Sequence, residues 1–365
     1  MKQCKPMVIV IAVILALSLF AFAACGNSGN TGSTGSTGTT SAPPANSGGS
    51  APATTAPPPS DEVFTLSWVS FRPENHSNVQ TIKTEIFEKL AERTNGRIIV
   101  EWKGGPEVVN PSDIGIGIQN GAFDISDNYV GAYESVVPGV GGASLTQYTP
   151  QEERLNGAYE FLANLHEPNG VKYLGRPAAQ KDNFFYTWLK SKKPMTQAEI
   201  SALSIGTAAG SQNAVTAWGV TPTMVGVPEN YEALNSGIVD AIAGQPLEGA
   251  ISNGYNVLCD YVIDHPYYQS TVMIIMNLDK WNSLPQDLQE IFMEVMIEGE
   301  NTAMETRDAS ELVSRKTVEE GGTEFYKLPD DVADWYLSRA YDGAWEAHEA
   351  NFPTIAPELR KMLTK

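Results

Sequence analysis

Hydrophobic and polar positions from residue 64 onward follow strand and helix periods in turn. Phe64 to Ser70 alternates apolar and polar side chains, which predicts a strand. Residues 78–94 place apolar side chains on one helical face and end at Asn95-Gly96, which predicts a capped helix. The alternation continues, with further strands predicted at 98–102, 123–126, 171–175, 184–189, 203–207, 224–227, 261–263 and 271–276, and helices at 111–120, 150–165, 212–218 and 229–236. This order predicts an α/β fold with mainly parallel, doubly wound strands.

One seven-residue pattern, which we call the Gly-x-x-Asp unit, occurs twice. Residues 118–124 and 234–240 each give an apolar residue, two polar residues, a glycine suited to a left-handed helix cap, two more residues and an aspartate before a strand. Two copies of one helix–glycine–strand unit predict two similar α/β lobes that face each other. That is the architecture of a binding protein.

The longest predicted helix starts within residues 283–286, extends to Glu320 and would span more than about 50 Å at about 1.5 Å per residue. A helix that crosses both lobes explains this length, although Gly299 could equally divide it into two helices. Amphipathic helices are predicted at 331–351 and 356–363. We expect one lobe at 61–187 plus 272–300, and a second lobe with the C-terminal helices at 188–271 plus 301–365.

The N-terminus carries the pattern of a secretory leader, with Lys2 and Lys5 before an apolar run over residues 7–24. A membrane-spanning helix is the alternative, since the run would be roughly 27 Å long. The small residues before Cys25 resemble the lipobox of bacterial lipoproteins, which implies cleavage before Cys25 and lipid on its thiol. Residues 26–60 contain only Gly, Ser, Thr, Ala, Pro and Asn, which predicts a disordered tether. We therefore expect a secreted protein, lipid-anchored at the outer face of the cytoplasmic membrane or periplasmic.

Charge and cysteine content narrow the function classes. The net charge is −19, and removal of the leader with its two lysines takes it to −21, which argues against nucleic acid or an anionic membrane surface as a partner. Cys259 would be the only cysteine left besides Cys25, so no disulfide framework is possible.

The sequence offers no recognisable catalytic or metal motif. The four histidines are far apart, and none has the H-E-x-x-H spacing of a zinc site. Residues 250–254 lack the first glycine of G-x-S-x-G, and residues 115–120 lack the third glycine of a dinucleotide-binding turn. A carboxylate pair brought together by the fold stays open. We expect no enzyme activity, cofactor or metal.

Three stretches and the order of elements resemble the solute-binding proteins of TRAP (tripartite ATP-independent periplasmic) transporters. The stretches are Glu229–Asp240 (Glu-Asn-Tyr-Glu-Ala-Leu-Asn-Ser-Gly-Ile-Val-Asp), Leu278–Pro285 and Thr94–Arg97. The resemblance implies a periplasmic-binding-protein-like fold of the class II type, with hinge strands and a long helix spanning both lobes. It further implies that a small organic solute is enclosed between the lobes and passed to a membrane permease. A ligand-binding sensor or partner-recognition lipoprotein is the alternative, and an enzyme on this fold a weaker one.

Ligands of open α/β sheets lie beyond the carboxyl ends of the strands, so the residues at these ends are candidate ligand contacts. Core packing is an equally open interpretation for Trp68 and Tyr129, and Gln245 is the strongest candidate for an amide contact. The predicted ligand-binding residues are Trp68, Arg72, Asn128, Tyr129, Arg176, Gly206, Gln212 and Gln245.

The sequence departs from the family at Gly206, where most relatives carry an arginine that binds a substrate carboxylate through two parallel hydrogen bonds. Two hypotheses follow. Either Arg72 or Arg176 enters the cleft and binds an acid from another direction, or the ligand is neutral or aromatic and is held by stacking and amides. Loss of a side chain at Gly206 would also enlarge the pocket for a bulkier solute.

Overall fold

The computed structural model describes residues 62–226, 229–269 and 272–365. The predicted leader (residues 1–24), Cys25 and the predicted tether lie outside the described residues. No helix in these described ranges is both long enough and apolar enough to cross a membrane.

The described strands form two mixed sheets. The first has the order β2-β1-β3-β10-β4 and the second the order β11-β9-β5-β8-β6-β7. The first sheet consists of β1 (Phe64–Ser70), β2 (Ile98–Gly104), β3 (Ile125–Tyr129), β4 (Val171–Gly175) and β10 (Val272–Asn277). The second consists of β5 (Phe185–Leu189), β6 (Ile205–Thr207), β7 (Thr223–Met224), β8 (Ala241–Gln245), β9 (Tyr261–Tyr267) and β11 (Glu324–Tyr326). The predicted two-lobed α/β fold is confirmed, but β10 runs antiparallel to both of its neighbours, as does β5, so neither sheet is purely parallel.

The two Gly-x-x-Asp units adopt the same local structure. Gly121 and Gly237 have left-handed φ angles of 76° and 74°, which residues with a Cβ rarely adopt. The aspartate of each unit then accepts a backbone hydrogen bond from the neighbouring segment: Asp124 Oδ2 from Ser67 N at 2.7 Å, and Asp240 Oδ2 from Ser204 N at 3.1 Å. Strands β3 and β8 begin directly after these aspartates. The first unit's strand therefore starts later than the predicted residue 123.

Most predicted helices are present with small shifts at their ends. The predicted segments correspond to α1 (Ser77–Ile82), η1 (Lys83–Glu88), α2 (Lys89–Arg93), α3 (Pro111–Gln119), α4 (Pro150–Asn156), α5 (Ala158–His166), α7 (Gln212–Ala217), α8 (Asn230–Ser236), α12 (Gln286–Glu320), α13 (Asp330–Asn351) and α14 (Ala356–Leu363). Four short helices have no predicted counterpart: α6 (Gln197–Ser201), α9 (Leu247–Ser252), α10 (Tyr255–Leu258) and α11 (Leu278–Ser283). The single helix predicted over 150–165 is wrong, because Gly157 turns the chain with a φ of 88° and separates α4 from α5.

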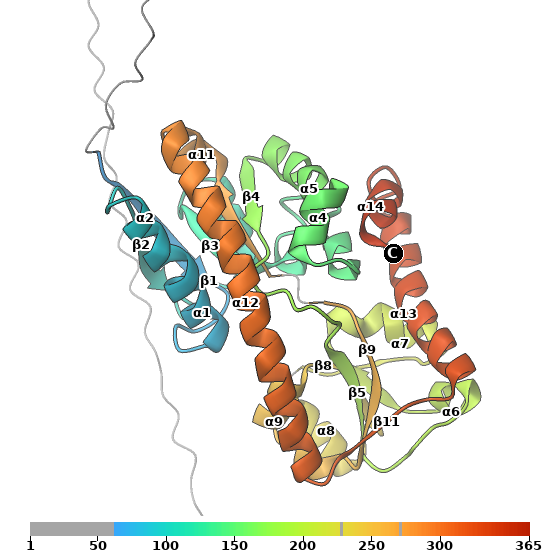
Figure 1. Cartoon of the computed structure of the whole chain (residues 1–365). Coiled ribbons are helices and arrows are strands. Elements are labelled where there is room, and N and C mark those ends of the chain that lie inside the picture. Colours follow the sequence, from blue (N-terminus) through green and yellow to red (C-terminus); the bar gives the residue numbers. More distant parts are fainter. Residues whose placement is uncertain (1–61, 227–228, 270–271) are drawn as a thin grey trace, which may run out of the picture. The chain divides into compact units, whose positions relative to one another are not determined.

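Helix α12 is continuous through Gly299, which settles the alternative left open by the sequence. It packs against α2, η1 and β4 of the first half and against α9 and β11 of the second, as the long orange helix in Figure 1 shows. A Cβ on Gly299 would lie 2.4 Å from Ile86 Cγ1 in the π-helix η1. Glycine therefore permits the close approach of these two helices.

The chain crosses between the sheets through the β4–β5 and β9–β10 connections as well as through α12. Helix α13 packs on both halves, against α7 and against the 3-10 helix η3 (Val140–Leu145). On the second half, Trp218 stacks on Tyr336 of α13 with ring centroids 4.2 Å apart. The lobe boundaries proposed from the sequence stay a prediction; β5 of the second sheet begins at Phe185, ahead of residue 188.

Candidate functional site

A cavity of about 1390 Å³ is lined by segments of both halves of the fold. The first sheet contributes the segments that follow β1 and β3, and the second contributes those that follow β6 and β8. Helices α1, α9, α12 and α13 complete the walls. The carboxyl ends of strands thus border the cavity, as expected for ligand sites in α/β sheets. Its aromatic lining consists of Phe71, Tyr129, Phe184, Phe185, Tyr268 and Phe352.

Arg72 follows β1 directly and lies in this lining. Its backbone N–H donates to Ser70 Oγ at 3.0 Å, and its guanidinium carbon lies 4.4 Å from the centroid of the Phe71 ring. Its Nη1 is buried, and no described residue gives it a hydrogen-bond partner. Burial lowers the pKa of Arg72 to about 10, and nearby Asp127 opposes the shift. Arg72 therefore stays protonated at neutral pH and can still bind an anion.

The negative charge of Asp127 favours the protonated form of Arg72. Asp127 is fully buried, and its carboxylate accepts hydrogen bonds from Trp68 Nε1 and from Ser70 Oγ, each at 2.8 Å. Burial raises the pKa of Asp127 to about 6, while Arg72 and the two hydrogen bonds oppose that rise. Trp68 thus acts on Asp127 and does not line the large cavity.

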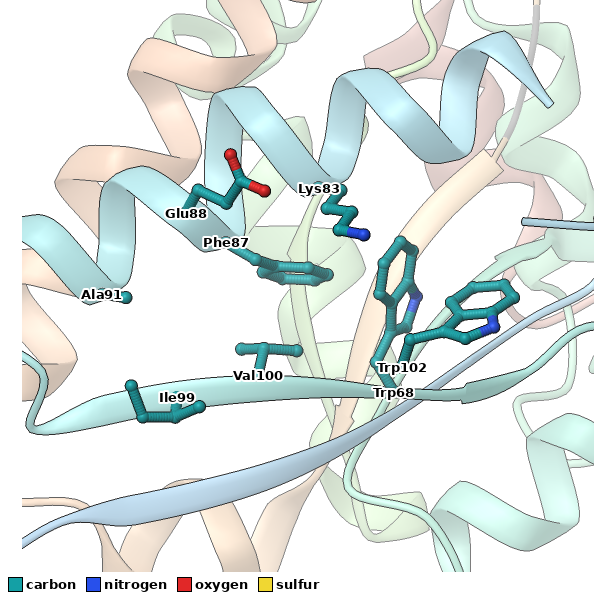
Figure 2. A pocket seen from close by; sticks show the side chains of 8 residues that line it. All are labelled: Trp68, Lys83, Phe87, Glu88, Ala91, Ile99, Val100 and Trp102. Carbon is teal, nitrogen blue, oxygen red and sulfur yellow. The ribbon is translucent and has the colours of Figure 1, made fainter. Parts of the chain in front are cut away.

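A smaller pocket of about 240 Å³ contains Trp68 instead (Figure 2). Figure 2 shows the Trp68 and Trp102 indoles beside the Phe87 ring, between helix and strand. Phe87 and Trp102 meet Trp68 edge-on, with ring centroids 4.9 and 4.7 Å away. The lining of this smaller pocket is mostly apolar, and only Lys83 and Glu88 in it are charged. The pocket therefore lacks the converging polar groups of a site for an organic solute.

A second arginine, Arg307 of α12, also lines the cavity and was not predicted from the sequence. Its Nη1 donates to Asn78 Oδ1 and its Nη2 to Gln180 Oε1 at 3.4 Å. Its Nε is buried without a hydrogen-bond partner among the described residues. Burial lowers the pKa of Arg307. The one available signal was the polar stretch around residues 298–308 in a helix that had to cross between the lobes.

The other predicted contacts divide into cavity and non-cavity positions. Tyr129 is 42% exposed and lines the cavity. Asn128 is buried, and its side chain binds Pro111 O at 3.0 Å and Tyr129 N at 2.9 Å. Gln212 and Gln245 lie next to lining residues Asn213 and Pro246 without lining the cavity themselves. Ligand contact by these residues stays a prediction.

Arg176 lies outside the cavity lining, with 1% of its surface exposed. Its Nη2 donates to Glu153 Oε1 at 2.9 Å and to Tyr148 O at 2.8 Å, and its Nη1 to Gln269 Oε1 at 3.2 Å. These internal contacts occupy the face that a substrate carboxylate would need. Of the two arginines weighed from the sequence, only Arg72 lines the cavity.

Gly206 is not among the residues that line the cavity, and its effect on the size of the pocket stays a prediction. A Cβ at this position would lie 2.7 Å from Ile242 Cδ1 and 3.4 Å from both Val225 Cγ2 and Val239 Cγ1. The space beside Gly206 is therefore filled by packed aliphatic side chains of the second half.

Comparison with known proteins gives one family match. Residues 70–337 match the sequence model of the family described as bacterial extracellular solute-binding protein, family 7. The matched region includes both arginines of the cavity and all of α12.

Solved structures of TRAP periplasmic solute-binding proteins share the fold. A Bordetella pertussis extracytoplasmic solute receptor binding pyroglutamic acid has a TM-score of 0.67 at 15% identity, over 83% of this chain and 100% of that one. A Roseobacter denitrificans protein with bound β-D-glucuronate has a TM-score of 0.67 at 17% identity, over 83% and 100%. A Desulfovibrio salexigens protein with bound orotic acid has a TM-score of 0.68 at 17% identity, over 82% and 97%. At these identities the likeness is one of fold.

Proposed function

The chain belongs to family 7 of the bacterial extracellular solute-binding proteins, and from this premise we propose that it captures a small organic acid and delivers it to the membrane permease of a TRAP transporter. Three of the solved structures that share the fold hold pyroglutamate, glucuronate and orotate, which are all carboxylic acids. The family is one of solute-binding receptors, which argues against the enzyme alternative.

The observation that carries the acid assignment is the pair of cavity arginines. Neither Arg72 nor Arg307 forms an ion pair with any described residue, although each has a buried nitrogen without a hydrogen-bond partner. Buried donors of this kind cost free energy until a partner satisfies them. A carboxylate supplies two acceptor oxygens and a negative charge. Arg72 and Arg307 would then replace the arginine that most relatives carry at the position of Gly206.

Capture would proceed by closure of the two halves around the acid. Arg72 and α1 belong to the first half, whereas Pro246 and Glu248 follow β8 of the second, and all line one cavity. Ser77 Oγ of α1 lies 3.5 Å from Glu248 Oε1 of α9, so polar groups of the two walls meet. A ligand that contacts both walls only in the closed form shifts the population toward that form.

Matched acids and neutral analogues test the proposal. We expect at least one of glucuronate, orotate and pyroglutamate to raise the melting temperature saturably, because a ligand that binds only the folded state stabilises it. The controls are D-glucose, uracil and 2-pyrrolidinone, which lack the carboxylate, and we expect no shift from them. Shifts of equal size from the neutral compounds would instead favour a neutral ligand held by stacking and amides.

Lipid anchoring at Cys25 belongs to the same proposal and keeps the receptor beside its permease at the outer face of the membrane. Replacement of Cys25 by alanine should move the protein from the membrane fraction to the medium or periplasm, because no acyl chain can be attached. Cys4→Ala, inside the predicted leader, is the matched control and should remain anchored. An unchanged membrane fraction for Cys25→Ala would show that the apolar leader itself holds the protein.

A further inference from the structure

One face of α12 supplies a row of polar side chains to the cavity. Thr306, Arg307, Ser310, Glu311 and Ser314 all line it. Their spacing of one, three and four residues places them on one side of a helix. The apolar neighbours Leu312 and Val313 are 71% and 67% exposed, so they point away from that side. The helix therefore presents a polar face to the solute.

Glu311 lies one turn beyond Arg307 on this face. Its Oε1 is buried, and no described residue donates a hydrogen bond to it. Burial raises the pKa of Glu311, whereas hydrogen bonding to Tyr186 and the charge of Arg307 oppose the rise. The cavity thus holds an unpartnered acceptor within one helical turn of an unpartnered donor.

The three unpartnered atoms define a pattern. Arg72 Nη1 and Arg307 Nε are donors, and Glu311 Oε1 is an acceptor. Arg72, Arg307 and Glu311 all line the same cavity, so the three groups face one bound ligand. Side chains four residues apart on a helix have Cβ atoms roughly 6 Å apart. A ligand that satisfies all three atoms needs an anionic group and a donor only a few bonds away from it.

We infer that Glu311 selects organic acids that carry a hydrogen-bond donor, such as a hydroxyl, a lactam N–H or an ammonium group, close to the carboxylate. The inference rests on the proposed function, since it assumes that the carboxylate lies against Arg72 and Arg307. An acid without the donor would leave Glu311 Oε1 buried and unsatisfied. A site built to bind such a donor rejects analogues that lack it much more strongly than an apolar pocket rejects a missing methylene.

Calorimetry with skeleton-matched acids tests this inference. The pairs are L-pyroglutamate against 3-oxocyclopentanecarboxylate, which keeps the ring carbonyl and replaces the N–H by CH2, and 3-phenyllactate against 3-phenylpropanoate. In at least one pair we expect the wild-type protein to bind the donor-bearing acid tenfold or more tightly than its partner. Glu311→Gln removes the charged acceptor with little change of shape. It should weaken binding of the donor-bearing acid at least tenfold and change the affinity for the matched acid without the donor less than threefold.

Glu305→Gln on the exposed side of α12 is the matched control and should leave all affinities unchanged. Equal affinities within both pairs, or an equal loss for both members in Glu311→Gln, would overturn the role of Glu311 while leaving the proposed function intact. Failure of all four acids to bind, together with glucuronate and orotate, would overturn the proposed function and this inference with it.

Discussion

Replacement of Arg72 by glutamine will weaken binding of a carboxylate ligand by about 10- to 100-fold. Hydrogen bonds to charged groups contribute about 1.5–3 kcal/mol, and about 1.4 kcal/mol corresponds to tenfold in affinity. The backbone of Arg72 is hydrogen-bonded to Ser70 Oγ and its guanidinium packs over the Phe71 ring, and both contacts restrict the freedom of the side chain before a ligand arrives. Isothermal titration calorimetry with the acid identified by thermal shift measures the change.

Two further variants define what Arg72 contributes. Arg72→Lys keeps the charge but loses the planar pair of donors, and we expect it to recover only part of the affinity. Arg93→Gln removes an arginine from the exposed end of α2, where it pairs with Glu294 and Glu298, and should leave binding unchanged. Binding by Arg72→Gln within threefold of the wild type, in a folded protein, would show that Arg72 is a structural charge only.

The sequence predicted the scaffold because local signals and the hydrophobic pattern agreed. Each Gly-x-x-Asp unit needs only a glycine that tolerates a positive φ and an aspartate that can accept a backbone N–H, and both requirements can be recognised from sequence. The full extent of α12 was also among the predictions, although the sequence left a break at Gly299 open. Gly157 was missed because a single glycine inside an amphipathic stretch does not reveal whether the chain turns there.

The site was predicted less completely because side-chain direction depends on packing between distant segments. Trp68 lies in the first strand and Arg72 directly after it, yet Trp68 donates a hydrogen bond to Asp127 whereas Arg72 lines the cavity. Arg307 is 235 positions further along the chain than Arg72. Only the path of α12 across both halves brings it to the same cavity.

Replacement of Arg176 by methionine will lower the free energy of unfolding by about 3–5 kcal/mol, the usual cost of removing one partner from a buried ion pair. Glu153, which is 2% exposed, would stay buried without its cation, with Thr146 Oγ1 as a remaining hydrogen-bond donor. Chemical denaturation of the purified protein measures the loss. This effect is the opposite of that at Arg72, where we expect a loss of affinity with little loss of stability.

Arg176 is expected to contribute this much to the free energy of unfolding because it contacts all three connections between the sheets. It lies directly after β4 in the first crossing, and its Nη1 binds Gln269 in the second. Its backbone N–H donates to Glu300 Oε1 of α12 at 2.6 Å. Loss of the guanidinium therefore loosens the region about which the two halves must close, besides leaving a buried carboxylate without its cation.

A double variant separates these effects from ligand binding. Arg176→Met combined with Glu153→Gln removes both charges, and we expect it to regain a large part of the lost stability, because no unpaired charge stays buried. Affinity of the folded single variant for the acid should stay within threefold of the wild type. A tenfold loss of affinity in the double variant, at restored stability, would instead make Arg176 the carboxylate-binding arginine that Arg72 is proposed to be.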